Sequence, residues 1–296
     1  MGQKIRSYVM PAAMLTGILF YPYLSLLGWI TPYLVAIMLF ISYSTISLNK
    51  IRITRLHLIL LLIQIVGSAV LFLSMNIFNT VVAQAAMICV LAPTATSAIV
   101  ITHILDGNEE SLTTYSLLSN LVVILFAPFY FSYIGYKHDL SFTDSSLLIF
   151  GRVFTILLLP LFVAVLLRFI LPSVHETVIK CRGISFYLWA VALVVVSART
   201  VQFIMDQGSE NYGTEILVGI VSLFVCAMQF FLGKRIGEKY NDRVAGGQGL
   251  GQKNTVLAIW MAQSFLNPIS SIGPGLYIVW QNVINSYQVW KKANRE

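Results

Sequence analysis

The sequence predicts an all-α membrane protein of about ten transmembrane helices in two inverted five-helix repeats. Three observations predict this fold. The 296 residues are 57% hydrophobic and only 10% charged, with a mean hydropathy of +0.80, whereas soluble domains are roughly 45–50% apolar and 25% charged. Apolar stretches that could cross a hydrocarbon layer of ~30 Å recur along the whole chain. Basic residues gather in alternate loops between these stretches.

The apolar stretches are separated by short polar breaks, which leave no room for a soluble domain. A spanning helix needs about 20 mainly apolar residues. We expect helices at Tyr8 to Leu26, Trp29 to Leu48, Leu56 to Met75, Phe78 to Leu105, Leu112 to Gly135, Ser145 to Leu171, Gly183 to Met205, Glu215 to Gly233, Val244 to Leu266 and Gly273 to Trp290. The first stretch continues into Tyr21-Pro22-Tyr23 without a small-residue cleavage site, so we interpret it as a retained helix.

The positive charges indicate the orientation of the chain. One set of alternate loops contains Lys4, Arg6, Lys50, Arg52, Arg55, Arg168, Lys180, Arg182, Lys234, Arg235, Lys239, Arg243, Lys291, Lys292 and Arg295, whereas the other contains Lys137, Arg152 and Arg199. Loops rich in lysine and arginine stay in the cytoplasm. The pattern therefore predicts a multi-pass protein of the inner (cytoplasmic) membrane with both termini cytoplasmic. Because the net charge of +7 is explained in this way, no nucleic-acid partner is expected.

Two helices, the fourth of each half, are predicted to be broken. The halves are residues 1–138 and 139–296, and an odd number of helices in each half inverts the second. Pro93 interrupts the fourth helix because proline removes a backbone hydrogen bond, and the glycine-rich run from Gly246 to Asn254, including Gly251, interrupts the ninth by flexibility. Paired interruptions of this kind indicate a transporter's binding site. The alternative is that proline and glycine are simply common in membrane helices.

Polar residues expected at mid-membrane depth cluster in the third, fourth, fifth, ninth and tenth helices. The set is Gln64, Thr96, Ser97, Ser116, Ser119, Asn120, Gln252, Lys253, Asn254, Thr255, Gln263, Gln281 and Asn282. A helical serine or threonine usually bonds to its own backbone, whereas Asn120 and Asn254 could bond between helices or belong to a site. Lys253 is either a functional residue, as ionisable groups at that depth usually are, or a lysine that pairs with helix carbonyls.

The sequence carries no signature of an enzyme. Cys89, Cys181 and Cys226 are far apart and lack metal-ligand spacing, and the four histidines form no HExxH or similar group. All twelve acidic residues fall in loops or at helix ends of the predicted fold, so no paired carboxylates or nucleophile and base are expected at depth. We therefore expect neither catalysis nor a metal or cofactor.

The order and spacing of these motifs resemble the bile acid:sodium symporter family over nearly the whole chain. The segment from Leu91 to Thr102, followed by an acidic loop with Gly107, is similar to the family's broken fourth helix. The segments Gly251 to Ala258, Pro274-Gly275 and Val279 to Asn282 are similar to its ninth and tenth helices. The resemblance implies panel and core domains, crossed broken helices four and nine, and transport of organic anions, usually driven by sodium.

The resemblance also implies site residues. Thr96 and Asn254 match residues near the substrate, and Gln281 and Asn282 match a polar pair of the last helix. Ser116, Asn120 and Gln64 match cation ligands, with Gln252 beside them in the ninth helix, but the sodium sites depart from the family pattern. Ala98 and Ile99 replace a serine and an asparagine, Gly249 replaces a glutamate, and Lys253 replaces a glutamine. Because a lysine ammonium offers no oxygen ligand, both sodium sites are expected to be disabled.

The leading hypothesis is a secondary transporter of a small organic anion, such as a bile acid-like molecule or another carboxylate, with Lys253 in place of a sodium ion and as part of the substrate site. Reversible protonation of Lys253 would couple uptake to protons, whereas a permanent charge would make the protein a uniporter. The alternatives are a sodium-coupled symporter with a remodelled site and a membrane sensor that no longer transports. The pattern specifies neither the substrate, the direction of transport nor the oligomeric state.

Overall fold

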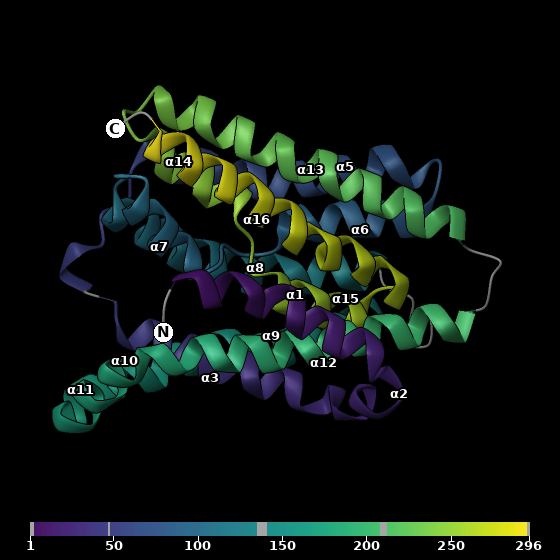
Figure 1. The fold of residues 1–296 in the computed structure, drawn as a ribbon, viewed down its shortest axis with the longest axis horizontal. Helices are drawn as coiled ribbons and strands as arrows, with labels where there is room; N and C mark the ends of the chain where they lie inside the picture. Colours follow the sequence, from purple (N-terminus) through teal and green to yellow (C-terminus); the bar gives the residue numbers. More distant parts are fainter. Residues whose placement is uncertain (1–2, 47, 135–140, 208–211, 295–296) are drawn as a thin grey trace. The chain divides into compact units, whose positions relative to one another are not determined.

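The computed structural model describes residues 3–46, 48–134, 141–207 and 212–294, and these residues are almost entirely helical (Figure 1). In this part of the chain the one extended pairing is an isolated antiparallel bridge between Thr94 and Lys253. The predicted boundary between the repeats, at residues 138 and 139, lies outside the described residues, as do Lys137 and Arg295.

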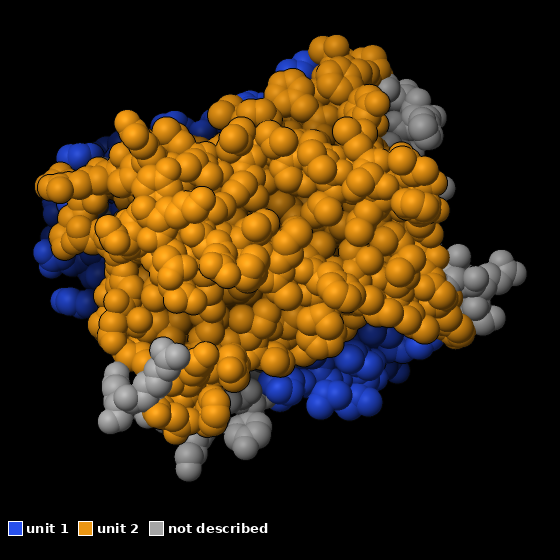
Figure 2. Space-filling model, turned by 90° about the horizontal axis from the view of Figure 1, so that it is seen from above, with its two compact units in different colours: residues 1–46, 147–211 blue, residues 47–146, 212–296 orange. Residues whose placement is uncertain are grey.

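The helices form two compact units, distinguished by colour in Figure 2. Unit 1 contains residues 1–46 and 147–211, and unit 2 contains residues 47–146 and 212–296. Each unit therefore draws on both halves of the chain, so neither unit corresponds to one predicted repeat.

Unit 1 is built around two helix pairs. Helix α1 (Gln3–Leu19) packs on α12 (Ile184–Gln207), and α3 (Thr31–Ser44) packs on α10 (Leu159–Ile170). The short elements α2 (Tyr21–Leu24) and Ser25–Ile30, a 3-10 helix, connect α1 to α3, and α11 (Pro172–Lys180) follows α10. The predicted span Ser145 to Leu171 is divided between α9 (Phe142–Leu157) and α10, because Pro160 at the start of α10 cannot continue the hydrogen bonds of α9.

Unit 2 contains both predicted helix breaks. The span Phe78 to Leu105 is divided into α6 (Thr80–Leu91) and α7 (Ser97–Ile104), and the span Val244 to Leu266 into α14 (Arg243–Gly251) and α15 (Thr255–Phe265). Around them lie α4 (Arg55–Leu62), α5 (Ser68–Asn76), α8 (Glu109–Ile134), α13 (Tyr212–Glu238) and α16 (Ile272–Ala293), with 3-10 turns at Leu48–Lys50 and Pro268–Ser271. A π-helical turn, Ile63–Gly67, joins α4 to α5.

The second break lies at the C-terminal end of the predicted run from Gly246 to Asn254. Gly246 to Gly251 are helical, and the chain leaves the helix only at Gln252 to Asn254. The glycines instead permit close packing, because a Cβ atom at Gly246 would overlap the backbone of Gly233 and approach that of Gly237 on α13. Close packing on neighbouring helices, on α13 at Gly246 and on α8 (Glu109–Ile134) at Gly249, is therefore a physical role of these glycines.

Length and apolar composition allow six helical segments of the described chain to cross a membrane. They are Tyr21–Ser44, Arg55–Asn76, Glu109–Ile134, Phe142–Ile170, Ile184–Asp206 and Tyr212–Glu238. Helices α6 and α15 are apolar but shorter, because the breaks divide the two predicted spans to which they belong. Many large apolar side chains, such as Phe78 and Tyr133, are exposed, as expected for surfaces that face lipid rather than water.

Candidate functional site

The two helix breaks of unit 2 satisfy each other's backbone groups. The Asn254 N–H donates to the Pro93 carbonyl at 2.8 Å, and the Ala95 N–H donates to the Gln252 carbonyl at 3.0 Å. A break within a membrane helix strands polar backbone groups, which must find partners within the protein or in water. Here the two extended segments supply those partners as a miniature antiparallel pair around Thr94 and Lys253. We call this region the crossing.

Pro93 accounts for the local geometry of the first break. Proline lacks an N–H and disfavours helical geometry in the residue before it, and Ala92 has the extended ψ of 140°. Beyond the break, Thr96 and Asn254 occupy the N-cap positions of α7 and α15. The Asn254 side chain accepts a hydrogen bond from the Leu257 N–H at 3.3 Å. The positive ends of two short helices therefore begin at the crossing.

Gln64 connects three elements on one side of the crossing. Its Nε2 donates to the Leu91 carbonyl at 2.7 Å, and its Oε1 accepts from the hydroxyls of Ser119 at 2.8 Å and Tyr115 at 3.2 Å. Gln64 lies in the π-helical turn between α4 and α5, a distortion that is frequent at functional sites. Because its relative exposure is 0%, Gln64 is a structural tie between the π-helical turn, α6 and α8.

Thr94 joins the first break to α8 and α14. Its N–H donates to Ser119 Oγ at 3.2 Å, and its hydroxyl donates to the Gly249 carbonyl at 2.7 Å. Gly249 also leaves space for the Tyr115 ring, which a Cβ atom would meet at 2.8 Å. Gly249 is therefore packed against an aromatic side chain, with its carbonyl engaged by a hydroxyl.

Lys253 lies within the second break and is buried, with 1% of its surface exposed. Its ammonium donates to the Val90 carbonyl at 2.8 Å, at the end of α6. No other lysine, arginine or acidic residue is buried in the part of the chain that the structure describes. When protonated, the Lys253 amine therefore places a positive charge at the end of a broken helix, where the negative end of the helix dipole favours it.

Gln281 and Tyr277 of α16 hold the second break in place. Gln281 Oε1 accepts from the Lys253 N–H at 2.9 Å, and its Nε2 donates to the Lys253 carbonyl at 3.4 Å. The Tyr277 hydroxyl donates to the Gly251 carbonyl at 2.8 Å. Both side chains act on the backbone of the break, so they position Lys253 instead of contacting its ammonium.

The remaining predicted residues have different surroundings. Gln252 donates to Ser97 Oγ at 2.9 Å and accepts from Asn285 Nδ2 at 3.0 Å. Ser116 makes only a 3.5 Å contact with the Thr94 carbonyl. Asn120 and Asn282 each donate to a carbonyl of their own helix, at 2.8 and 2.6 Å.

These contacts show which of the predicted cation ligands already have partners within the protein. The Gln64 and Gly249 oxygens accept protein hydrogen bonds, and a sodium ion needs several oxygen ligands free to coordinate it. Asn120 Oδ1 is buried without a partner, but a single amide oxygen is not a site. Within the described ranges no group of three or more histidine, cysteine, aspartate or glutamate residues could hold a metal. Two of the predicted cation ligands, Gln64 and Gly249, are therefore already engaged by hydroxyl groups of the protein.

Several residues of this network were not singled out from the sequence. Thr94, Tyr115, Gln229, Tyr277 and Asn285 all make buried hydrogen bonds at or beside the crossing. Asn285 could have been found from the sequence, because it lies four residues after Gln281 and therefore shares one face of α16 with it. The aromatic hydroxyls gave no such signal, because tyrosines in apolar helices are usually packing residues.

The sequence matches the model of the SBF-like CPA transporter family over residues 23–281. That match covers both breaks and most of the chain. The chain belongs to this family. No curated protein matches the chain. The SBF-like family is related to the bile acid:sodium symporters, so the predicted relationship is confirmed at that level. The family is one of membrane transporters.

Proposed function

We propose that this SBF-like protein is a secondary transporter of a small organic anion that works by alternating access, without sodium, with the Lys253 ammonium in the place of a coupling cation. The proposal keeps about ten spans in two inverted repeats, residues 1–138 and 139–296, in the inner membrane with both termini cytoplasmic. It assigns no catalytic step to the chain.

The observation that carries the proposal is the bond between Lys253 Nζ and the Val90 carbonyl, made by a fully buried ammonium at the crossing. In a transporter with broken helices, a coupling ion is held by carbonyls freed at the breaks. An ammonium that donates to such a carbonyl meets the same electrostatic need without dissociating. The crossing would then stay assembled whether or not sodium is present.

The anion itself would be held by more accessible groups than the ammonium. Thr96 and Asn254 are partly exposed, and each occupies the N-cap position of a short helix whose positive end faces the crossing. Half-helix N-termini attract anionic substrate groups in transporters of this type. In this proposal Thr96 and Asn254 contact the substrate. Lys253 adds a positive electric field at the substrate, and Gln281 positions Lys253.

Uptake into proteoliposomes of purified protein tests the proposal, with a panel of radiolabelled carboxylates that includes taurocholate and pantothenate. We expect one or more to enter at the same rate in sodium and in potassium buffer. Lys253→Gln should reduce uptake about tenfold or more, because a charge-assisted bond and the positive field are lost, whereas Lys239→Gln, which removes an exposed lysine, should leave it unchanged.

Three results would favour other mechanisms. Sodium-dependent uptake that survives Lys253→Gln would show a remodelled sodium site. Acceleration by an inward proton gradient, abolished in Lys253→Gln, would show that the lysine carries a proton across. Saturable binding without entry into the vesicles would indicate a sensor that has lost transport.

A further inference from the structure

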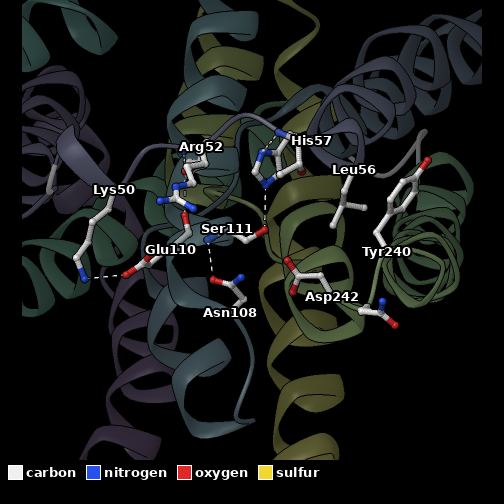
Figure 3. Close-up of a pocket in the computed structure, with 12 residues that line it drawn as sticks. Lys50, Arg52, Leu56, His57, Asn108, Glu110, Ser111, Tyr240 and Asp242 are labelled. Carbon is white, nitrogen blue, oxygen red and sulfur yellow. Dashed lines mark hydrogen bonds and ion pairs between the residues drawn. The ribbon is translucent and has the colours of Figure 1, made fainter.

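A cavity of about 450 Å³ lies in unit 2 and is lined by none of the residues of the crossing. It is formed where the segments before α4, α8 and α14 meet, from residues 50–57, 108–114 and 240–242 (Figure 3). Sites for small molecules usually have volumes of roughly 300–1,000 Å³. The cavity is large enough for a small metabolite and is lined mainly by polar side chains.

Two charged side chains of this cavity, Arg52 and Asp242, make no ion pair with a charged side chain in the described part of the chain. Lys50 and Glu110 pair with each other at 2.7 Å and so neutralise one another. Arg52 uses its backbone N–H to donate to Thr114 Oγ1 at 3.4 Å. Its guanidinium makes no ion pair within 4 Å in the described part of the chain, although its charge, like that of Lys50, interacts with the Glu110 carboxylate. Asp242 likewise pairs with no lysine or arginine there. In Figure 3 these two side chains come from different walls and face the space around Ser111.

Asp242 is in surroundings that favour a cationic partner. Burial raises the pKa of its carboxyl, and hydrogen bonding to Ser111 and to the Ala245 N–H and the electrostatic interaction with His57 only partly oppose this effect. A carboxylate that has lost water without gaining a counter-charge is unfavourable. An ammonium group in the cavity would remove that cost.

His57 shows that the cavity is not a hydrolytic site, although serine, histidine and aspartate meet there. His57 Nδ1 accepts the Thr54 N–H at 3.2 Å, so in the neutral ring Nε2 carries the proton and donates to Ser111 Oγ at 2.9 Å. A general base would need a free lone pair on Nε2 to take the serine proton. The imidazole therefore orients Ser111 and does not activate it.

We propose that this cavity binds a small zwitterion of the amino-acid type, with its carboxylate on Arg52 and Asn108 and its ammonium on Asp242. The Asn108 Oδ1 accepts the Ser111 N–H at 3.0 Å, which leaves the amide N–H groups to donate to a carboxylate. A planar guanidinium suits a carboxylate by paired hydrogen bonds. A simple anion would leave Asp242 unpaired, and a simple amine would leave Arg52 unpaired, whereas a zwitterion matches both.

The cavity also touches the starts of three helices that lead to the crossing. Helix α4 leads to Gln64, α8 carries Ser119, and α14 carries Gly249. An occupant that bridges Arg52 and Asp242 ties the segment before α4 to the start of α14. Occupancy is therefore expected to slow amide hydrogen exchange in α14, which would report binding independently of any transport.

Isothermal titration calorimetry of the purified full chain in detergent tests this site, with L-alanine and L-glutamine as probes and propionate and ethylamine as their one-charge counterparts. We expect at least one amino acid to bind about tenfold or more tightly than either counterpart. Arg52→Gln and Asp242→Asn should each weaken that binding about tenfold or more, because each removes one charged partner. Lys239→Gln is the matched control, an exposed lysine outside the cavity, and should bind as the unchanged protein does.

Other results would overturn the proposal. Propionate that binds as tightly as the amino acids, with no effect of Asp242→Asn, would show a simple anion site. Ethylamine that binds as tightly as the amino acids, with no effect of Arg52→Gln, would show a simple cation site. Absence of binding by both amino acids to folded protein would remove the site. Arg52 is exposed, so its variant remains informative if Asp242→Asn fails to fold. Because the assay measures binding alone, its outcome is independent of the transport proposal.

Discussion

At the scale of the residue, single side chains replace the hydrogen bonds that the helix breaks remove. Lys253 donates to the Val90 carbonyl, Gln64 donates to the Leu91 carbonyl, and Tyr277 donates to the Gly251 carbonyl. Each of these acceptors lies in the last turn of a helix that stops at the crossing, where carbonyls have no partner within the helix. A buried unpaired carbonyl costs about 1–3 kcal/mol, so these side chains stabilise the interrupted helices.

Gln64→Leu is expected to lower the stability of the protein. The substitution keeps the approximate volume but leaves the Leu91 carbonyl and the hydroxyls of Ser119 and Tyr115 without their amide partner. We expect a loss of about 1–3 kcal/mol or more, seen as a lower melting temperature in detergent. Gln202→Leu, at an exposed hydrogen bond on α12, should change it little. Equal melting temperatures for the two variants would contradict the structural role of Gln64.

At the scale of the element, α13 and α14 form a close helix pair built on glycine. Gly233 and Gly237 of α13 face Gly246 of α14, so that the two backbones come nearly into contact. Small residues allow this close approach in membrane proteins, where van der Waals packing and not the hydrophobic effect drives the association of helices. This packing holds α14 against α13, which is long enough to span the membrane. It therefore also fixes the position of the second break, which begins where α14 ends.

Gly246→Ala is expected to separate this helix pair. The added methyl group would overlap the Gly233 carbonyl, which is backbone and cannot rotate away. Overpacking of this kind costs about 1–3 kcal/mol, and we expect a lower melting temperature together with reduced uptake of any transported anion. Gly275→Ala is the control, because nothing lies within 4 Å of a Cβ atom there. A stable, active Gly246→Ala protein would disprove the close contact.

At the scale of the whole molecule, the predicted orientation puts the basic loops in the cytoplasm. The exposed Cys181 lies in one of these loops, between Lys180 and Arg182, whereas Cys89 and Cys226 are buried. The native cysteines therefore supply a probe of orientation without any substitution, because a membrane-impermeant reagent reaches only the thiol exposed on its own side.

A membrane-impermeant maleimide is expected to label inverted inner-membrane vesicles but not intact spheroplasts. Labelling should occur at Cys181 alone, since the two buried thiols are shielded from the reagent. Cys181→Ser should abolish it and serves as the control. Labelling of intact spheroplasts would reverse the predicted orientation of the chain.

The amino-acid sequence by itself determined that the chain is helical, apolar and interrupted in two places. Composition and the length of the apolar stretches indicate whether a segment is surrounded by lipid or by water. Pro93 interrupts its helix through its own ring and its missing N–H. Both features can therefore be predicted from a short stretch of sequence. The residues around the breaks were also predicted, because Lys253, Gln64 and Gln281 are polar side chains at depths where polarity is costly.

Only the tertiary structure decided what those residues contact. It showed that the glycine run is helical and packs on α13, that the break begins at Gln252, and that Gln281 bonds to the backbone of Lys253. It also brought Arg52 and Asp242, which are far apart in the sequence, to one cavity. Such pairings depend on which side of each helix faces its neighbours and on contacts between segments that are distant in the sequence. A hydropathy average gives neither, because it is taken over all sides of a helix.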